Sequence, residues 1–301
     1  DALYFDAQAV GSLPINRLST YWYMGDSSGY VDYSEETDMQ FQDAGSWYHI
    51  VLAVDTTQST ASDRIKYYVN GTLQTSKTQY YGQVPQNQDL SFNDNVLQNI
   101  GRSINIGDSR TFNGYMAEIN FIDGFQYDAS YFGEAKSGVW IAKRYSGSYG
   151  TNGYRLNFKS TDLNVSGSAV SDPRGSSTNL PNNAIADASG QGNHWTISGI
   201  GLHDFVPDCP ENVFATFNPL VNTNGSTQAD IKEGGLKVVK TGLTYSYFQA
   251  TMAVKSGKWY AEFRPTSTIT DPMIGVTNQN MSTYRTGDSV DPHLTAGTVW
   301  Y

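Results

Sequence analysis

The chain has 301 residues, which fits two domains of ordinary size, each able to bury a core without disulfides. Aromatic residues make up 13% of the chain, charged residues make up only 16%, and 29 glycines are available for turns, so the composition favours an all-β fold. The 19 Lys and Arg residues are scattered and the net charge is −10. This balance argues against a nucleic-acid partner, because phosphate binding needs clustered positive charge.

Cys209 is the only cysteine, so no disulfide can form within the chain. No stretch approaches the roughly 18 consecutive apolar residues of a membrane span, and the first residues lack the layout of a signal peptide. The chain opens without Met in a strand pattern at residues 2–5, and it stops in another at residues 299–301. We therefore expect a fragment that is trimmed at both ends.

The first pair of strands is expected on either side of a polar loop. Residues 47–54 form a continuous apolar run, and the polar stretch 55–63 follows. Ile65, Tyr67 and Val69 then recur with a period of two and share one face of a second strand.

The Asn70-Gly71 dipeptide predicts a hairpin into residues 72–75, because both turn residues tolerate positive φ. The period of two returns at residues 104–107 and 115–122, which predicts two further strands. A turn should follow at Asp123-Gly124.

A single helical turn is expected at residues 128–132, with Asp128 as its N-cap. No other helix is expected.

The chain changes character after residue 158. The tract 161–183 is rich in Ser, Asn, Asp and Pro and low in hydrophobicity. Beyond it, residues 251–254 and 259–263 flank a Lys-Ser-Gly-Lys turn and predict a hairpin, and residues 274–276 begin another strand. We expect a first sandwich over 1–158, a linker over 159–212, and the start of a second sandwich over 213–301.

Three segments taken in order resemble laminin-G-like domains of the concanavalin-A-like superfamily. They are an aromatic-rich strand at 47–55, a strand with an Asn-Gly hairpin at 65–71, and an Asn-Gly-x-x-Ala-Glu strand at 112–119. The resemblance implies a concanavalin-A-like jelly-roll sandwich whose first strands would precede residue 1.

Other segments resemble phage proteins. Residues 121–134 and 149–154 are similar to the version of this domain found in structural and tail-fibre proteins of marine bacteriophages. Residues 214–220 and 256–262 resemble the SPRY-like domain that follows in those proteins, which implies a second, incomplete β-sandwich.

The resemblance implies a non-enzymatic virion surface or tail-fibre protein that acts outside the cell and binds host surface polysaccharide. Such a protein would contact other virion subunits and form a homo-oligomer. Two alternatives share these folds: a purely structural virion decoration or scaffold protein, and an extracellular cell-surface adhesin.

The segment from Glu118 to Asp123 is similar to the Glu-x-Asp-x-x-Glu strand of glucanases on this fold, whose outer carboxylates act as nucleophile and acid/base. Here Asn120 replaces the central Asp, and Asp123 is one carbon shorter than the Glu it would replace. We therefore expect no catalytic residues. No His or Cys spacing predicts a zinc site, and no Gly-rich loop predicts nucleotide binding.

Residues 187–194 are similar to an Asp-x-Ser-Gly-x-Gly-Asn-His turn that is frequent in laminin-G-like domains, where it can hold calcium. Asp187, Ser189 and Asn193 would supply oxygen ligands, and Asp108 is a further candidate donor. The alternative is a tight turn that needs glycine at positive φ.

Tyrosines in polar, Gly-rich segments are the candidate glycan-binding residues, because a sugar's C–H face stacks on an aromatic ring while polar side chains bond its hydroxyls. Core or interface packing is the alternative for each of them. The candidates are Tyr80, Tyr81, Tyr145, Tyr149 and Tyr154.

Overall fold

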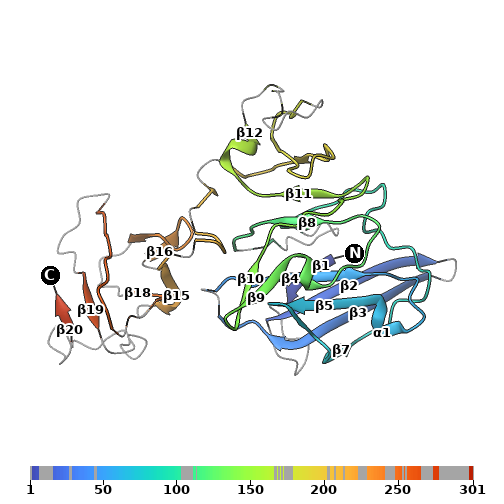
Figure 1. Cartoon of the computed structure of the whole chain (residues 1–301), viewed down its shortest axis with the longest axis horizontal. Coiled ribbons are helices and arrows are strands. Elements are labelled where there is room, and N and C mark those ends of the chain that lie inside the picture. Colours follow the sequence, from blue (N-terminus) through green and yellow to red (C-terminus); the bar gives the residue numbers. More distant parts are fainter. Residues whose placement is uncertain are drawn as a thin grey trace. The chain divides into compact units, whose positions relative to one another are not determined.

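In the computed structural model the chain forms two compact units, Asp1–Asn212 and Val213–Tyr301 (Figure 1). The structure describes residues 2–6, 16–26, 29–43, 46–102, 111–112, 114–165, 168, 170, 172, 179–201, 204–206, 208–212, 214–222, 229–240, 248–252, 254, 256–265, 274–277 and 298–300. The fold is all-β, as the sequence predicts, since strands far outnumber the three short helical segments found among these residues.

The first unit contains two antiparallel sheets that carry most of its core. One has the order β1-β2-β3-β7, with β1 Ala2–Asp6, β2 Arg17–Asp26, β3 Gly29–Gln40 and β7 Lys77–Gln79. The other has the order β4-β5-β6, with β4 Ile50–Val54, β5 Ile65–Val69 and β6 Thr72–Leu73. The sequence pattern predicts strands for the second sheet but none for β2 and β3.

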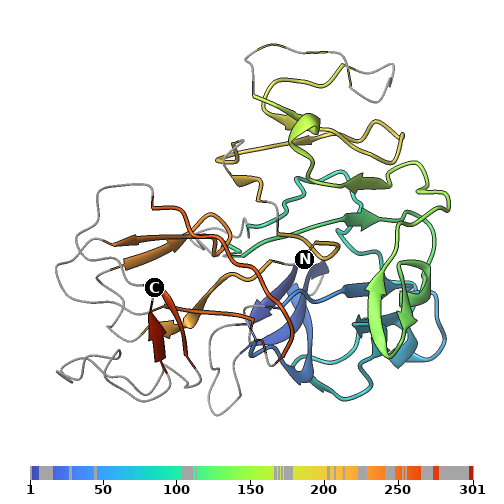
Figure 2. The same ribbon diagram turned by 60° about the vertical axis from the view of Figure 1, so that its left-hand side comes forward.

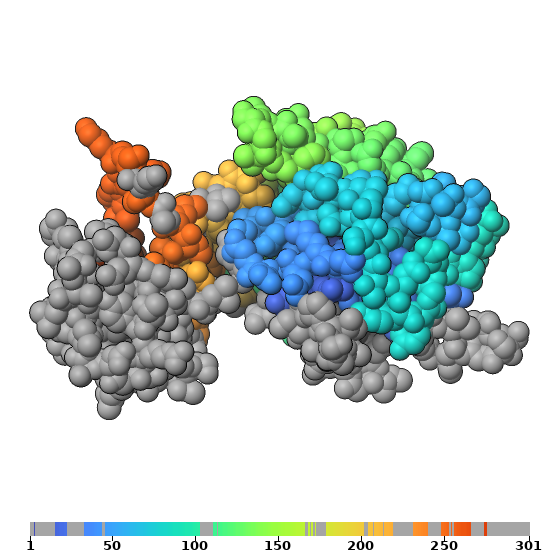
Figure 3. Space-filling view, turned by 90° about the horizontal axis from the view of Figure 1, so that it is seen from below, coloured from blue at the N-terminus to red at the C-terminus, as the bar shows by residue number. Residues whose placement is uncertain are grey.

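The core of the first unit lies between these two sheets. Leu18 and Trp22 of β2 pack in one cluster with Ile65 and Tyr67 of β5, and Val84 closes it. The period of two in β5 explains this, because Ile65, Tyr67 and Val69 are buried while the residues between them are only half-buried. The two sheets therefore stack as a sandwich. Figure 3 shows one face of the molecule, on which the blue and cyan segments form a continuous surface.

The predicted Asn-Gly hairpin between β5 and β6 is confirmed. Asn70 and Gly71 have φ values of 46° and 80°, and Val69 pairs with Thr72 across the turn. The side chain of Asn70 also accepts a hydrogen bond from the backbone N–H of His49 at 2.9 Å. The turn is thereby tied to the start of β4.

Shorter strand pairs complete the first unit. They are β8 Ile119–Phe121 with β11 Tyr154–Leu156, the hairpin of β9 Gly133–Lys136 and β10 Val139–Ala142, and the sheet of β12 Leu163–Asn164, β13 Ala184–Ile185 and β14 Trp195–Thr196. The last sheet lies in the segment 159–212, whose composition predicts a linker. In the structure this segment belongs to the first compact unit and bonds to it, for example through Asp187 and the backbone of Arg155.

The ring of Trp140 packs the β9–β10 hairpin against the turn between β5 and β6. Figure 2 shows this light green hairpin beside the blue and cyan strands. The Trp140 ring lies over two glycines, so close that a Cβ on Gly71 or Gly133 would be 2.3 or 2.4 Å from it. Its indole N–H donates to Nδ1 of His49 at 3.1 Å. Burial lowers the pKa of His49, which favours the neutral imidazole that this bond needs.

The described residues of the second unit form three two-stranded antiparallel sheets. These are β15 Phe217–Asn222 with β18 Phe248–Ala250, β16 Ala229–Lys232 with β17 Lys237–Lys240, and β19 Gly275–Thr277 with β20 Thr298–Trp300. The hairpin predicted around residues 255–258 is wrong, because residues 256–265 form no strand. Trp259 and Tyr260 there are exposed, and no described strand pairs with them.

The predicted helical turn is confirmed, but two helical segments that were not predicted also form. A 3-10 helix at Ala129–Tyr131 begins as predicted with Asp128, whose side chain accepts from the N–H of Ser130. However, α1 Ala61–Arg64 and the 3-10 helix Ser160–Asp162 also form. Helix α1 is held in place by Arg64, whose buried guanidinium donates to the carbonyls of Gln58, Ser59 and Val84.

The predicted strand at 115–122 is shorter than expected, because Glu118 has a positive φ of 52° just before β8 begins. The strand predicted at 104–107 lies outside the described residues. Within the described part of the chain, no helix has the length and apolar character needed to cross a membrane.

Two glycines with nearly the same backbone angle test the anchoring role of Trp140. Gly71 has φ +80° and touches the indole, whereas Gly138 has φ +81° and open space around it. We expect Gly138→Ala to lower the free energy of unfolding by about 1 kcal/mol through backbone strain alone. Gly71→Ala should cost about 1–3 kcal/mol more, because its Cβ overlaps the ring. Urea unfolding followed by tryptophan fluorescence measures both, and equal losses would contradict the packing.

Candidate functional site

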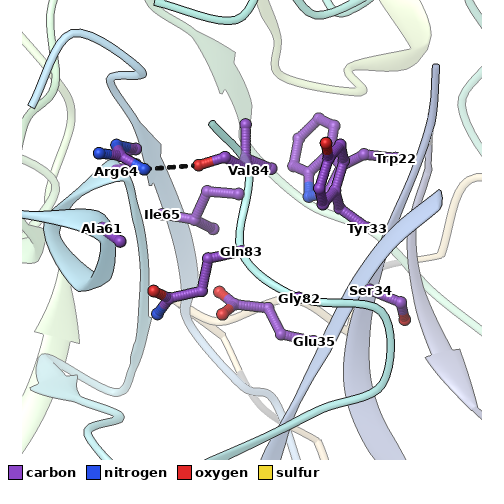
Figure 4. A pocket seen from close by; sticks show the side chains of 10 residues that line it. All are labelled: Trp22, Tyr33, Ser34, Glu35, Ala61, Arg64, Ile65, Gly82, Gln83 and Val84. Carbon is purple, nitrogen blue, oxygen red and sulfur yellow. Dashed lines mark hydrogen bonds between the residues drawn. The ribbon is translucent and has the colours of Figure 1, made fainter. Parts of the chain in front are cut away.

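One cavity of the first unit is too small for a sugar. It has a volume of about 10 Å³, roughly the space of one water molecule. Figure 4 shows side chains from β2, β3, β5 and the segment 82–84 converging on it, with Arg64 bonded to the carbonyl of Val84. Its lining is Trp22, Tyr33, Ser34, Glu35, Ala61, Arg64, Ile65, Gly82, Gln83 and Val84. This cavity is part of the packed core.

A second hollow opens on the surface and has a volume of about 360 Å³, within the range of small-ligand sites. We call it the tyrosine cleft. One wall is the outer face of β4 and β5, where Lys66 and Tyr68 alternate with the buried residues of β5. The other wall is the segment 126–131. The full lining is Ala53, Lys66, Tyr68, Gln126, Tyr127, Asp128 and Tyr131.

Two polar side chains fix the second wall. The amide of Gln126 donates to the backbone carbonyls of Asp63, at 2.9 Å, and Ala53, at 3.4 Å. The carboxylate of Asp128 accepts from the N–H and the hydroxyl of Ser130 at 2.7 and 2.5 Å. The first contact holds the segment against the end of β4, and the second starts the helical turn that carries Tyr131.

Aromatic rings form a continuous stack beside the cleft. Phe125 stacks on Tyr127 with ring centroids 5.3 Å apart, and Tyr127 stacks on Tyr131 at 4.0 Å. Phe125 is 57% exposed and Tyr131 is 47% exposed. The two ends of the stack are therefore open to solvent, as a surface that stacks on sugar rings must be.

The tyrosines predicted at 145 and 149 lie at the buried end of the same aromatic cluster. Tyr145 is 4% exposed and Tyr149 is 7% exposed, and their rings meet edge to face. Burial and a hydrogen bond with Tyr127 raise the pKa of Tyr145 to about 12. Neither ring has a face available to a ligand, so both pack in the core and are not sugar platforms.

The remaining predicted tyrosines do not line the cleft. Tyr154 packs between Phe121 and Trp195, and burial raises its pKa to about 12. Tyr80 is half-buried and its hydroxyl donates to Glu36 at 2.8 Å. Of the five, only Tyr81 is well exposed, at 61%, but it lies apart from the cleft lining.

Sequence reasoning missed the cleft residues, although a signal for them was present. Tyr68 alternates with Tyr67 and Val69, so it had to face away from the core. Tyr127 and Tyr131 flank the predicted cap at Asp128, and one helical turn brings residues at this spacing together. What the sequence could not show is that these two segments lie side by side.

The predicted calcium loop is organised around the buried carboxylate of Asp187. Its Oδ1 accepts from the backbone N–H groups of Arg155 and Ser189, both at 2.8 Å. Its Oδ2 accepts from the hydroxyl of Ser189 at 2.7 Å and from the N–H of Asn193 at 3.1 Å. The side chain of Asn193 in turn donates to the carbonyls of Thr151 and Gly153.

The geometry favours the alternative reading of this loop, a tight turn with glycines at positive φ. Gly190 and Gly192 have φ values of 91° and 82°, and both oxygens of Asp187 already accept bonds from the protein. No group of three or more His, Cys, Asp or Glu side chains suited to a metal occurs among the described residues, and Asp108 lies outside them. The loop therefore fastens the segment 187–193 to β11.

The glucanase-like segment is also used for structure. Both carboxylate oxygens of Glu118 bond the guanidinium of Arg155, at 2.7 and 2.8 Å. Asn120 accepts from the hydroxyl of Tyr149 at 2.8 Å. Asp123 accepts from the amide of Asn93 and from the N–H of Asn152. Each polar group has a protein partner, and Glu118 and Asp123 are committed to separate contacts.

Replacing Asp187 tests whether its carboxylate is structural. Asp187→Asn exchanges one acceptor oxygen for an amide that cannot accept, so we expect the free energy of unfolding to fall by about 2–3 kcal/mol. The control Ser189→Ala removes one neutral donor and should cost about 1 kcal/mol. Thermal unfolding of the unsubstituted chain should be the same in calcium and in EDTA, and a calcium-dependent rise in the midpoint would contradict this role.

Comparisons with known proteins bear on the first unit. Residues 3–125 match a laminin G family model described as the concanavalin A-like lectin/glucanases superfamily. The match confirms the concanavalin-A-like resemblance over these residues and agrees with the sandwich of the first unit. Neither the search of curated proteins nor the search of solved structures gave a match. The superfamily description covers both lectins and glucanases.

Proposed function

We propose that this chain is a non-enzymatic, glycan-binding component of a bacteriophage virion surface or tail fibre. The observation that carries the proposal is the tyrosine cleft, in which Tyr68, Tyr127 and Tyr131 line a surface hollow of about 360 Å³. Its size suits a small ligand, and its lining combines ring faces with polar tips.

The cleft has the two kinds of contact that sugar binding uses. A pyranose ring has an apolar C–H face, which the exposed ring of Tyr131 can cover. The same ring carries hydroxyls, which can bond the phenol groups of Tyr68 and Tyr131 and the ammonium of Lys66. Because Gln126 and Asp128 hold one wall rigidly, little conformational freedom is lost when a ligand binds.

We propose a non-enzymatic protein because the carboxylates at the glucanase-like position make structural contacts. A retaining glycosidase needs two carboxyl groups about 5–5.5 Å apart on either side of the scissile bond. Here Glu118 forms a bidentate pair with Arg155, and Asn120 stands where the central carboxylate would be. The tyrosine cleft itself contains a single carboxylate, Asp128, which caps a helical turn.

The virion assignment is supported by the resemblance of residues 121–134 and 149–154 to phage structural and tail-fibre proteins. Part of the proposed site lies in the first of these segments. A shallow cleft is adequate on a virion, because display of many copies turns weak single-site affinity into firm attachment.

A structural decoration protein is the second candidate, and the outer face of the β9–β10 hairpin favours it. Val139 is 63% exposed and Ile141 is 44% exposed, on a strand that pairs on one side with β9 and has no described partner on the other. Apolar edge strands of this kind pair readily with neighbouring chains. A virion scaffold would use this face in place of the cleft.

Tyr131→Ala separates the two candidates. We expect it to weaken retention of the chain by host-derived polysaccharide about five- to thirtyfold, since loss of ring stacking costs on the order of 1–2 kcal/mol. Affinity gel electrophoresis measures the effect. The matched control is Tyr81→Ala, which removes an equally large exposed ring outside the cleft and should leave retention unchanged.

Equal retention of the two variants would contradict glycan binding in the tyrosine cleft. Absence of any retention, with virion adsorption lost only when Val139 and Ile141 are both changed to Thr, would favour the structural decoration protein.

Hydrolysis is tested separately at Glu118. We expect the purified chain to release no reducing sugar from β-glucans, and Glu118→Gln to lower thermal stability because Arg155 loses its ionic partner. Release of reducing sugar that disappears in Glu118→Gln would show that the chain is an enzyme.

A further inference from the structure

We propose that the tyrosine cleft selects uncharged sugar rings and discriminates against acidic polysaccharides such as polyuronates and sulfated glycans. The inference rests on the proposed glycan-binding function and names the ligand class of the same site. It follows from the charges around the cleft and from how each is already engaged.

Lys66, the one cation among the described residues that line the cleft, is already paired. Lys66 Nζ lies 3.1 Å from Oδ1 of Asp63, a residue of α1 three positions earlier in the chain. Asp63 is outside the cleft lining, but it partly cancels the positive charge that an acidic sugar would need. Lys66 can still donate to a sugar hydroxyl, because an ammonium group has three N–H bonds.

The remaining charge of the cleft is negative. Asp128 belongs to the lining and is exposed, and its carboxylate is held in place by its bonds to Ser130. With Lys66 and Asp63 taken as a neutral pair, the site carries a charge of about −1, and the whole chain carries −10. A carboxylate or sulfate in the cleft would therefore face repulsion at short range and at long range.

The uncharged part of the lining explains what binds instead. The amide of Gln126 is turned toward the backbone of β4 and α1, and the ring of Tyr127 is covered by Phe125, Tyr131 and Tyr145. The ligand is therefore left with the ring of Tyr131 and the hydroxyls of Tyr68 and Tyr131. Ring stacking and neutral hydroxyl contacts suit hexose rings without acidic substituents.

Polymers that share a backbone and differ in charge test the inference. We would compare retention of the chain by hydroxyethylcellulose and carboxymethylcellulose, by dextran and dextran sulfate, and by methyl-esterified pectin and polygalacturonate, in affinity gels at low salt. The neutral member of at least one pair should retain the chain at least about fivefold more strongly than its acidic partner. That retention should fall about tenfold in Tyr131→Ala.

Asp63→Asn gives a variant that acts without touching the lining. The amide keeps the shape of the side chain but releases the ammonium of Lys66 from its partner. We expect retention by the acidic polymers to rise about three- to tenfold at low salt, on the order of one ion pair in water, and neutral retention to stay the same. Adding Lys66→Gln to Asp63→Asn should abolish the gain, and so should high salt.

The outcomes separate this inference from the proposed function. Stronger retention by the acidic members, or neutral retention that survives Tyr131→Ala, would overturn the ligand class while glycan binding stands. An Asp63→Asn variant with unchanged acidic retention would contradict the role of the Lys66–Asp63 pair. No retention by any of the six polymers would contradict glycan binding itself.

Discussion

The contact between Tyr67 and Thr20 is the constraint on which the first unit depends. Tyr67 is completely buried, and its hydroxyl shares a hydrogen bond with the side chain of Thr20 across the interior. Lys77 lies 5.3 Å from the centre of its ring and pairs with Glu35 at 2.9 Å. A polar tip inside a sandwich core costs free energy unless it is bonded, so this hydrogen bond ties β5 of one sheet to β2 of the other.

The tyrosine cleft follows from that constraint. With Tyr67 turned inward, its neighbours Lys66 and Tyr68 must face outward, because successive side chains of a strand alternate. The opposite wall needs two further contacts, which Gln126 and Asp128 make with the backbone. The surface on which the proposed function depends is thus the outer side of the same strand that closes the core.

The carboxylates that the sequence offers as candidates for metal binding or catalysis make structural contacts in the folded chain. Asp187 collects four hydrogen bonds and fastens the loop 187–193 to β11. Glu118 neutralises Arg155, whose guanidinium is mostly buried and needs an ionic partner. Both carboxylates are therefore engaged by other groups of the protein.

The sequence by itself determined the elements whose signal is local. It predicted the all-β class, the strands β4 and β5, the positive φ of Asn70 and Gly71, and the cap at Asp128, because alternation, turn chemistry and capping act over a few residues. Tertiary structure decided the rest. Tyr145 and Tyr149 share their polar, Gly-rich sequence setting with exposed tyrosines, yet they are buried because Tyr127, Phe132 and each other cover them. The cleft joins Lys66 and Tyr68 to Tyr131 across about sixty residues of chain, and only packing brings such distant segments together.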